Sequence, residues 1–478
     1  MTRQQRLTLA ISVLGAFVTF LDGSVINVAL PAISKELGGG ITAQLWIVDA
    51  YLISLGTLVL LAGSLSDAYG QLRILRIGLI GFGSASLLIA VAPNTELLIA
   101  LRAIQGIGGA LLVPSSLALI ISAFKGPAQA RAIGMWTGLT ASAFIAGPLV
   151  GGLFVDYLSW RLVFAVNLVP IATTLVLIAL LKHPKERTKH APIDWVSAVL
   201  GIVGLGGPVY ALIEQASFGW ANPTIYIPCA VGVIAITAFV FRQRAVSNPM
   251  IPPQLFTVRN FAVGNIATAL FYAALSLGGF VITVYLQEVA GYSATFAGLS
   301  GLPISIASIF LASRFGTLAG KHGPRWFMGF GPILAGVGYL LILATGTHVD
   351  YWTEVLPGIV LLAIGLAATV SPLTAAVLGA IPPERAGIGS AINNAASRVA
   401  GLVATAVVGV ILGEQLNEAS FHRALIVTAI ILFVAGGVSL AGIRNPKTAV
   451  QIPLAITTQT GCIPLPTQTD DDAFQHVA

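Results

Sequence analysis

Two carboxyl groups and one guanidinium lie inside long apolar stretches near the start of the chain. Asp22, Asp49 and Arg102 are each several residues from the nearest polar segment. An ionisable side chain inside a bilayer costs roughly 2.5–3.5 kcal/mol on insertion scales, which makes it a candidate functional group. A nearby arginine favours the ionised carboxylate, whereas desolvation favours the neutral acid. A conformational change that alters either effect would load or release a proton, so this chemistry is reversible proton binding.

The same three residues also have a purely structural interpretation. A buried ion pair can fix how helices pack without carrying any chemistry. At 1.5 Å of helix rise per residue, all three fall roughly 7–12 Å below the same membrane boundary and can meet in one cluster. The sequence leaves the proton-binding and the structural interpretations open.

A second polar group lies near the end of the chain. Arg398 follows Asn393 and Asn394 at spacings of five and four residues, which place them on part of one helix face. This face suits a polar or anionic group of a substrate, or it pairs with a carboxylate from another part of the chain. Glu214 is close to the end of its own apolar run. It is a further candidate for a substrate cavity, and a position at the membrane surface explains it equally well.

The composition of the chain indicates that these side chains lie on membrane-spanning helices. Hydrophobic residues make up 56% of the 478 residues and charged residues only 9%, whereas a soluble domain carries roughly 25% charge. The chain is therefore a polytopic membrane protein, and a helix needs about 20 apolar residues to span the hydrocarbon. We predict fourteen such helices, at approximately 8–30, 43–62, 75–93, 97–119, 134–155, 162–181, 194–216, 224–242, 262–287, 296–315, 326–345, 354–379, 386–412 and 424–442.

The charge distribution predicts the orientation of these helices. Of the 24 Lys and Arg, only Lys35, Arg161 and Arg423 fall in loops on the side opposite the N-terminus. Because cytoplasmic loops are enriched in Lys and Arg, both termini are expected in the cytoplasm. The net charge of +6 thus reflects topology, and we expect no nucleic-acid partner. No nucleotide-binding, metal-ligand or paired-cysteine motif occurs, so we expect no enzyme activity, cofactor or metal.

The chain divides into four parts. Residues 1–181 hold six predicted helices, and 182–260 hold a basic loop, two further helices and a proline-containing linker. Six more helices occupy 261–443, and 444–478 are a polar segment that we expect to be a disordered cytoplasmic tail. The predicted fold is two six-helix bundles with two additional central helices.

One short polar segment occurs twice. Residues 63–73 join the second and third predicted helices as a glycine-bounded loop, and a related loop occupies 316–325. Asp67 of the first copy is replaced by Gly320 in the second. A repeated loop indicates two related halves, and parallel repeats of this kind are typical of transporters.

A proline interrupts a small-residue pattern in the fifth predicted helix. Gly147 and Gly151 are four residues apart, a spacing that lets membrane helices approach closely, and Gly152 follows directly. Pro148 removes a backbone hydrogen bond within the same turn. Close packing alone explains most glycines of this chain, but here a bent, close-packed helix predicts a hinge.

Several motifs together resemble those of the fourteen-helix drug:proton antiporter family of the major facilitator superfamily. The first-helix pattern Leu-Asp-Gly-Ser-Val-Ile-Asn-Val-Ala-Leu-Pro is similar to that family's opening motif, and the order and spacing of the others fit as well. The similar segments are 21–31, 46–51, 63–73, 101–106, 147–152 and 160–170. The resemblance departs from the family at Gln71 and Leu72, where basic residues are usual.

The resemblance implies roles for particular residues. It implies an alternating-access exporter that exchanges protons for drugs or other amphipathic molecules, driven by a proton gradient. The proton-coupling residues would be Asp22, Asp49 and Arg102. The substrate cavity would include Gln105, Glu214, Asn393, Asn394 and Arg398. The cytoplasmic gate latch would be Gly63, Asp67, Gly70 and Arg73, and the hinge Gly147, Pro148, Gly151 and Gly152.

Gate closure would bring Asp67 to the start of the thirteenth helix, near 383–387. The expected partners are a small-molecule substrate, protons and the lipid bilayer of a plasma or inner membrane, and we expect a monomer. Two alternatives remain at this point. One is an exporter of a single endogenous metabolite such as a sugar, peptide or siderophore, because cavity shape sets selectivity. The other is a non-transporting receptor or scaffold on the same fold.

Overall fold

Fourteen helices in the described part of the chain are long and apolar enough to cross a membrane, as predicted. This computed structural model describes residues 1–125, 127–181, 194–246, 249–346, 349–382, 385–413 and 416–445. The predicted basic loop at 182–193 lies outside the described residues, as does the predicted tail from residue 446 onward. Helices dominate because each one satisfies its own backbone hydrogen bonds, which lipid cannot do.

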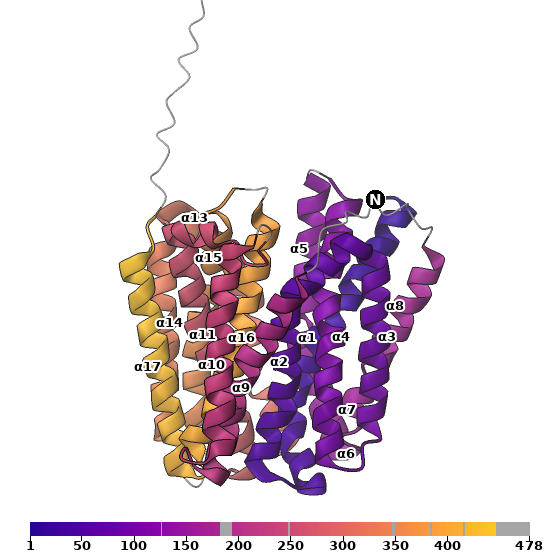
Figure 1. Cartoon of the computed structure of the whole chain (residues 1–478). Helices are drawn as coiled ribbons and strands as arrows, with labels where there is room; N and C mark the ends of the chain where they lie inside the picture. Colours follow the sequence, from indigo (N-terminus) through magenta and orange to yellow (C-terminus); the bar gives the residue numbers. More distant parts are fainter. Residues whose placement is uncertain are drawn as a thin grey trace, which may run out of the picture. The chain divides into compact units, whose positions relative to one another are not determined.

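The first six spans form the N half, defined here as α1 to α8 (Figure 1). Two of its helices begin at side-chain caps: Thr2 and Gln5 form a capping box at α1, and Asn94 accepts a hydrogen bond from the Leu97 backbone at α4. The elements are α1 (Arg3–Leu37), α2 (Gly40–Tyr69), α3 (Gln71–Ala90), α4 (Thr95–Ala123), α5 (Pro127–Ala141), α6 (Ala143–Tyr157), α7 (Leu162–Ala165) and α8 (Leu168–Leu180).

Two additional helices, α9 (Trp195–Phe218) and α10 (Pro223–Ala245), pack against each other, and α9 also packs against α2 and against α16 of the second half. Asp194 caps α9 by accepting from the Ser197 backbone, and its carboxylate also binds Arg242 of α10 at 2.9 Å. Burial alone would raise the pKa of Asp194, but hydrogen bonds from Arg242 and Ser197 outweigh it and hold that pKa below its ordinary value.

The last six spans form the C half, α11 to α17. The elements are α11 (Arg259–Glu288), α12 (Ala294–Leu299), α13 (Leu302–His322), α14 (Pro324–Leu341), α15 (Leu356–Leu378), α16 (Ala386–Leu412) and α17 (Glu418–Gly442). Three short helical turns accompany them, at Pro253–Thr257, Ile342–Ala344 and Tyr351–Val355.

The segment 63–73 is not the loop that we predicted. Residues up to Tyr69 continue α2, and α3 begins at Gln71, so only Gly70 separates the two helices. Gly70 has φ 97°, a left-handed value that glycine adopts without strain, and Gly323 has φ 85° at the same place between α13 and α14. The two halves thus share one sharp glycine turn in the repeated segment.

The fifth span is interrupted close to the predicted hinge. Helix α5 ends at Ala141 and α6 begins at Ala143, one turn before Pro148. A Cβ at Gly151 would overlap the Val25 side chain of α1, so only glycine permits this approach. The predicted close packing of the Gly147–Gly151 face is therefore present, and its partner is α1.

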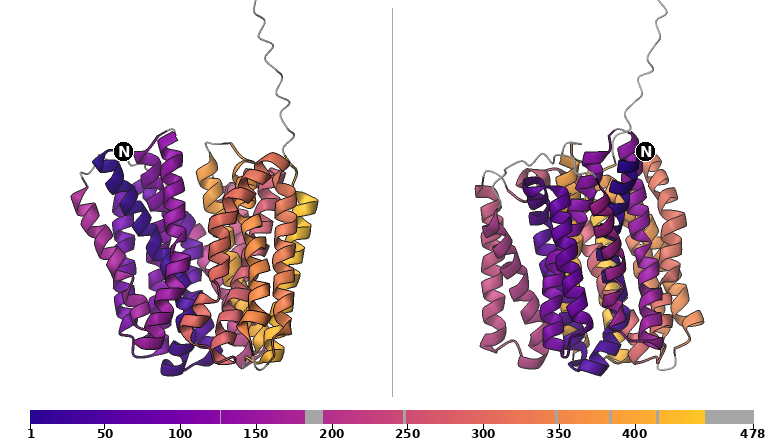
Figure 2. Two further views of the ribbon diagram at one scale, coloured as in Figure 1. Left: turned by 180° about the vertical axis from the view of Figure 1, so that it is seen from behind. Right: turned by 90° about the vertical axis from the view of Figure 1, so that its right-hand side faces the viewer.

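The two halves converge at one end of the bundle. We call the end that holds the N-terminus the N-terminal end and the opposite one the distal end. The ribbons of the halves stand apart at the N-terminal end and approach each other at the distal end (Figures 1 and 2). Distal contacts include the hydrogen bond from Gln44 of α2 to Glu288 of α11, at 2.7 Å.

Candidate proton-coupling and substrate site

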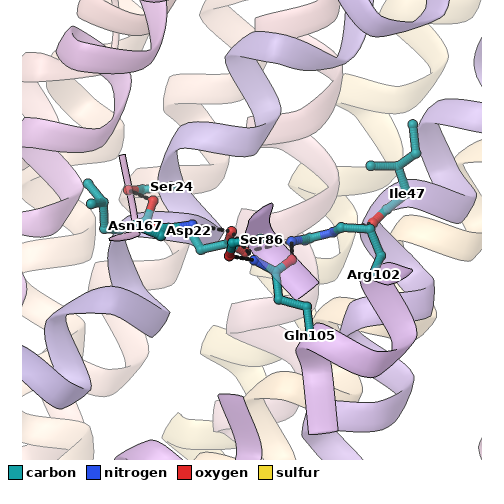
Figure 3. Close-up of polar contacts among 8 residues, drawn as sticks. Asp22, Ser24, Ile47, Ser86, Arg102, Gln105 and Asn167 are labelled. Carbon is teal, nitrogen blue, oxygen red and sulfur yellow. Dashed lines mark hydrogen bonds and ion pairs between the residues drawn. The ribbon is translucent and has the colours of Figure 1, made fainter. Parts of the chain in front are cut away.

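Asp22 and Arg102 form a fully buried ion pair in the core of the N half (Figure 3). The Arg102 Nη1 atom lies 2.6 Å from Asp22 Oδ2, on α4 and α1 respectively. The same nitrogen donates to Gln105 Oε1 at 2.6 Å, and Arg102 Nε donates to the Ile47 carbonyl of α2 at 3.0 Å. The guanidinium also lies over the Tyr51 ring, 4.3 Å from its centroid.

Two amides complete the coordination of the Asp22 carboxylate. Oδ1 of Asp22 accepts from Gln105 Nε2 at 3.0 Å and from Asn167 Nδ2 at 3.0 Å. Gln105 Nε2 also donates to Ser86 Oγ of α3 at 2.8 Å. Every side chain of this network is fully buried, and both oxygens of the Asp22 carboxyl group have hydrogen-bond partners within it. Sequence reasoning found Asp22 and Arg102 but missed Ser86 and Asn167.

The tryptophan-arginine motif at 160–170 connects α1 to the loop before α7. Trp160 Nε1 donates to Glu36 Oε2 at 2.6 Å, and Arg161 Nη1 lies 2.5 Å from Glu36 Oε1. Asn167, seven residues later, reaches Asp22 as described above. These contacts hold α1 at two positions along its length, Glu36 and Asp22, and keep the Asp22 side chain turned towards α4.

Asp49 is in the opposite situation. It is fully buried on α2, and neither carboxyl oxygen has a hydrogen-bond partner. A lone buried carboxylate is far more costly than a neutral carboxylic acid, so this environment favours protonated Asp49. We expected Asp22, Asp49 and Arg102 to meet in one cluster, but the structure brings only Asp22 and Arg102 together.

The register of α2 shows which helices surround Asp49. Leu45, four residues earlier, packs where α16 approaches at Gly409. Trp46, three residues earlier, donates to Glu214 Oε1 of α9 at 2.7 Å. Because residues three and four apart share a helix face, Asp49 lies at the seam where the N half meets α9 and the C half.

A cavity of about 280 Å³ lies between the halves. Helices α1 and α6 line it from the N half, and α11 to α15 line it from the C half. Its described lining residues carry no charge; those with polar side-chain groups are Ser24, Asn27, Thr283, Ser300 and Tyr339. Pro148 of the predicted hinge also lines this cavity.

The structure places the expected substrate-cavity residues elsewhere. Gln105 belongs to the buried Asp22 network, and Glu214 accepts the Trp46 indole N–H at the α2–α9 contact. Asn393 donates to Thr268 Oγ1 of α11 at 2.7 Å, and Asn394 accepts from Arg398 Nε at 3.1 Å. None of these residues is among those that line the cavity. Apolar and glycine positions form most of its wall, and no sequence signal distinguishes them.

A contact at the distal end joins the halves and was not expected from the sequence. Asp156, at the end of α6, accepts backbone hydrogen bonds from Ala294 at 2.9 Å and from Thr295 at 2.8 Å. Both donors lie in the first turn of α12 in the C half. Nothing in the sequence around Asp156 indicates a partner so distant in the chain.

The residues of the expected gate latch lie at the N-terminal end. Asp67 and Arg73 are exposed there, on α2 and α3. Helix α16, the expected partner, begins at Ala386, and its N-cap residue Arg385 provides no side-chain hydrogen bond to the first turn. Residues 383 and 384 of the expected contact lie outside the described part of the chain.

Comparison with known proteins places this arrangement of helices among membrane transporters. The model of the Major Facilitator Superfamily matches residues 12–405 and, in a second match, 264–464. A structure of the peptide transporter POT in complex with sulfate has a TM-score of 0.68 at 18% identity, covering 92% of this chain and 94% of that one. A bacterial homologue of the human lysosomal transporter Spinster, in an inward-facing and unoccupied conformation, has a TM-score of 0.66 at 16% identity, covering 92% and 97%.

The similar sequences are resistance and export proteins. The multidrug resistance protein Stp of Mycobacterium tuberculosis is 34% identical over 428 residues, 87% of this chain and 78% of that protein. The puromycin resistance protein pur8 of Streptomyces alboniger is 33% identical, covering 82% of this chain and 78% of that one. The chain belongs to the Major Facilitator Superfamily and groups with its drug-resistance members, as its fourteen spans and motifs indicated. It is therefore a transporter-family protein and not an enzyme.

Proposed function

We propose that this protein is a proton-coupled antiporter that exports drugs or other amphipathic small molecules by alternating access, with both termini in the cytoplasm. The observation that carries the proposal is the contrast between two buried carboxyl groups of the N half. Asp22 pairs with Arg102, whereas Asp49 has no hydrogen-bond partner and is favoured as the neutral acid. Asp49 is thus the residue that carries the exchangeable proton, and the Asp22–Arg102 pair keeps α1 and α4 in place.

The position of Asp49 connects protonation to movement of the halves. Its seam lies between α2, α9 and α16, which belong to different moving parts. Separation of the halves at the distal end would let water reach Asp49 and allow its proton to exchange with the outside. Closure of that end would return Asp49 to a dry environment, where only the protonated form is stable. For a proton to move inward, water must then reach this seam from the N-terminal end, so that Asp49 releases its proton on that side before the distal end opens again.

The distal end and the N-terminal end would open in turn, each closed by its own contact. The distal end is closed by Asp156, which binds the α12 backbone. The N-terminal end would close when Asp67 docks on the uncapped first turn of α16, an interaction of about 0.3–1 kcal/mol at a helix N-terminus. The fifth span, interrupted at Ser142 between α5 and α6 and packed through Gly151 on α1, would bend between the two states.

An exporter of one endogenous metabolite is the nearest alternative. The cavity of about 280 Å³ has an apolar wall with few polar groups, which favours amphipathic solutes over sugars or peptides. The receptor or scaffold alternative predicts no solute movement at all, and it leaves a costly unpaired acid at Asp49 without a role.

Accumulation of a compound panel in cells tests the proposal. Cells that express the protein should accumulate less of the exported compounds than cells without it, and collapse of the proton gradient should remove the difference. Asp49→Asn should behave like the empty cells while the protein remains in the membrane. Export that persists at full rate after the gradient has collapsed would exclude proton coupling, and export restricted to one metabolite would favour the alternative.

A further inference from the structure

Arg398 is a cation in the middle of a membrane helix, and no carboxylate among the described residues forms an ion pair with it. The ion pairs found among the described residues join Arg102 to Asp22, Arg161 to Glu36 and Arg242 to Asp194, and Arg398 is in none of them. Its Nε atom donates to Asn394 Oδ1 at 3.1 Å. A guanidinium has five N–H donors, so this one has capacity for a further acceptor.

Aromatic rings connect Arg398 to the cavity between the halves. The guanidinium carbon lies 5.9 Å from the centroid of the Phe20 ring, on α1 of the N half. Phe20 in turn makes an edge contact with Phe144, with 5.9 Å between centroids, and Phe144 lines the cavity. Tyr51 and Tyr272 lie close enough to interact electrostatically with the guanidinium. The charge therefore connects to the cavity wall through two aromatic rings, Phe20 and then Phe144, and aromatic side chains from both halves lie around it.

Neighbouring contacts hold this region of α16 in place. Asn393 donates to Thr268 Oγ1 and to Asn265 Oδ1 of α11. The Cβ atom of Arg398 lies 3.8 Å from the position a Cβ would take at Gly56 of α2, which confirms that α16 meets the N half here. The guanidinium is thus fixed at the contact of the two halves and not displayed on the outer surface.

We propose that Arg398 and the adjoining cavity bind an amphipathic organic anion, with the substrate carboxylate on the guanidinium and its apolar body against Phe20 and Phe144. This inference rests on the proposed export function and names the substrate class. A carboxylate matches the planar fork of arginine with two parallel hydrogen bonds. It would also supply the negative charge that the described residues around Arg398 do not, while a cationic solute would be repelled.

Three naphthalene derivatives of nearly equal size test the charge preference. They are naphthalene-1-acetate, its uncharged amide and the 1-naphthylmethylammonium cation. Their affinity for the purified full-length protein in lipid nanodiscs is measured by calorimetry at neutral pH. We expect the anion to bind at least tenfold more tightly than the amide, and the cation more weakly than either. Equal or tighter binding of the amide or cation, or no binding of the anion, would overturn the proposal.

Variants separate recognition from folding. Arg398→Gln should lower the affinity for naphthalene-1-acetate at least tenfold and leave the affinity for the amide within a factor of two. The matched control Arg314→Gln removes an exposed arginine of α13 in the same half and should change neither. If Arg398→Gln does not fold, Arg398→Lys keeps the charge without the fork and should retain an anion preference of reduced size. Loss of amide and anion binding in equal measure would show that Arg398 only shapes the cavity.

The binding assay does not depend on transport. Anion-selective binding without any export in cells would retain this site and refute the proposed function. Export of cations or neutral drugs by a protein that binds no organic anion would retain the proposed function and refute this site.

Discussion

Replacing Asp22 and replacing Asp49, the two buried acids discussed above, should affect the stability of the protein very differently. Asp22→Asn would leave Arg102 fully buried with no counter-charge, although two amides and one carbonyl would still contact the site. Breaking a buried ion pair by removing one partner costs about 3–5 kcal/mol, mostly because the remaining charge is uncompensated. Asp49→Asn replaces one neutral, partnerless side chain by another of nearly the same size, so we expect a change within about 1 kcal/mol.

Thermal unfolding of the purified variants, followed by tryptophan fluorescence, measures this difference. The melting temperature of Asp22→Asn should fall by several degrees, and that of Asp49→Asn should stay near the wild-type value. The double variant Asp22→Asn, Arg102→Gln removes both charges and should recover most of the loss, since replacing a whole buried pair is often neutral. A wild-type melting temperature for Asp22→Asn, or equal destabilisation by Asp49→Asn, would refute the assignment of a structural pair and a separate proton carrier.

Three further variants test the gates and the hinge. Gly151→Leu should stop turnover while drug binding is partly kept, because its side chain would overlap α1; full transport in vesicles would count against the hinge. Asp67→Asn should raise maleimide labelling of cysteines placed at the N-terminal end of the cavity, whereas Gly320→Ala, the matching position of the repeat, should not; identical labelling of both would show that the segment is only a connector. Asp156→Ala removes two charge-assisted hydrogen bonds worth about 2 kcal/mol in this partly exposed place, so labelling from the distal side should rise roughly 30-fold; unchanged labelling would exclude the distal gate.

The helices could be predicted from the sequence because each one needs only a long apolar run. The failure at 63–73 has a physical reason: a polar, glycine-bounded segment is typical of a loop, yet a membrane helix can continue past the apolar region. Residues from Gly63 to Tyr69 therefore extend α2, and Gly70 alone makes the turn. The glycine spacing of the fifth helix correctly predicted close packing, because small residues have a direct geometric effect.

The site was predictable only where charge marks a residue. Asp22, Asp49 and Arg102 stand out because charges are rare inside the membrane, but which of the acids meets the arginine depends on how α1, α2 and α4 are rotated. The contact of Asp156 with α12 depends on two segments far apart in the chain. Gln105 lies beside Arg102 in its motif, yet its amide turns into the core and not into the cavity.

Drug exchange and proton-driven transport in reconstituted vesicles show whether Asp49 carries the exchangeable proton. The measurement uses the compound that cells export best, with Asp49→Asn compared to wild type. Our account predicts that Asp49→Asn still exchanges labelled for unlabelled drug across the membrane, because binding and rocking remain, but neither releases protons on drug addition nor accumulates drug with an imposed proton gradient. Wild-type proton release and gradient-driven accumulation in Asp49→Asn would contradict the account.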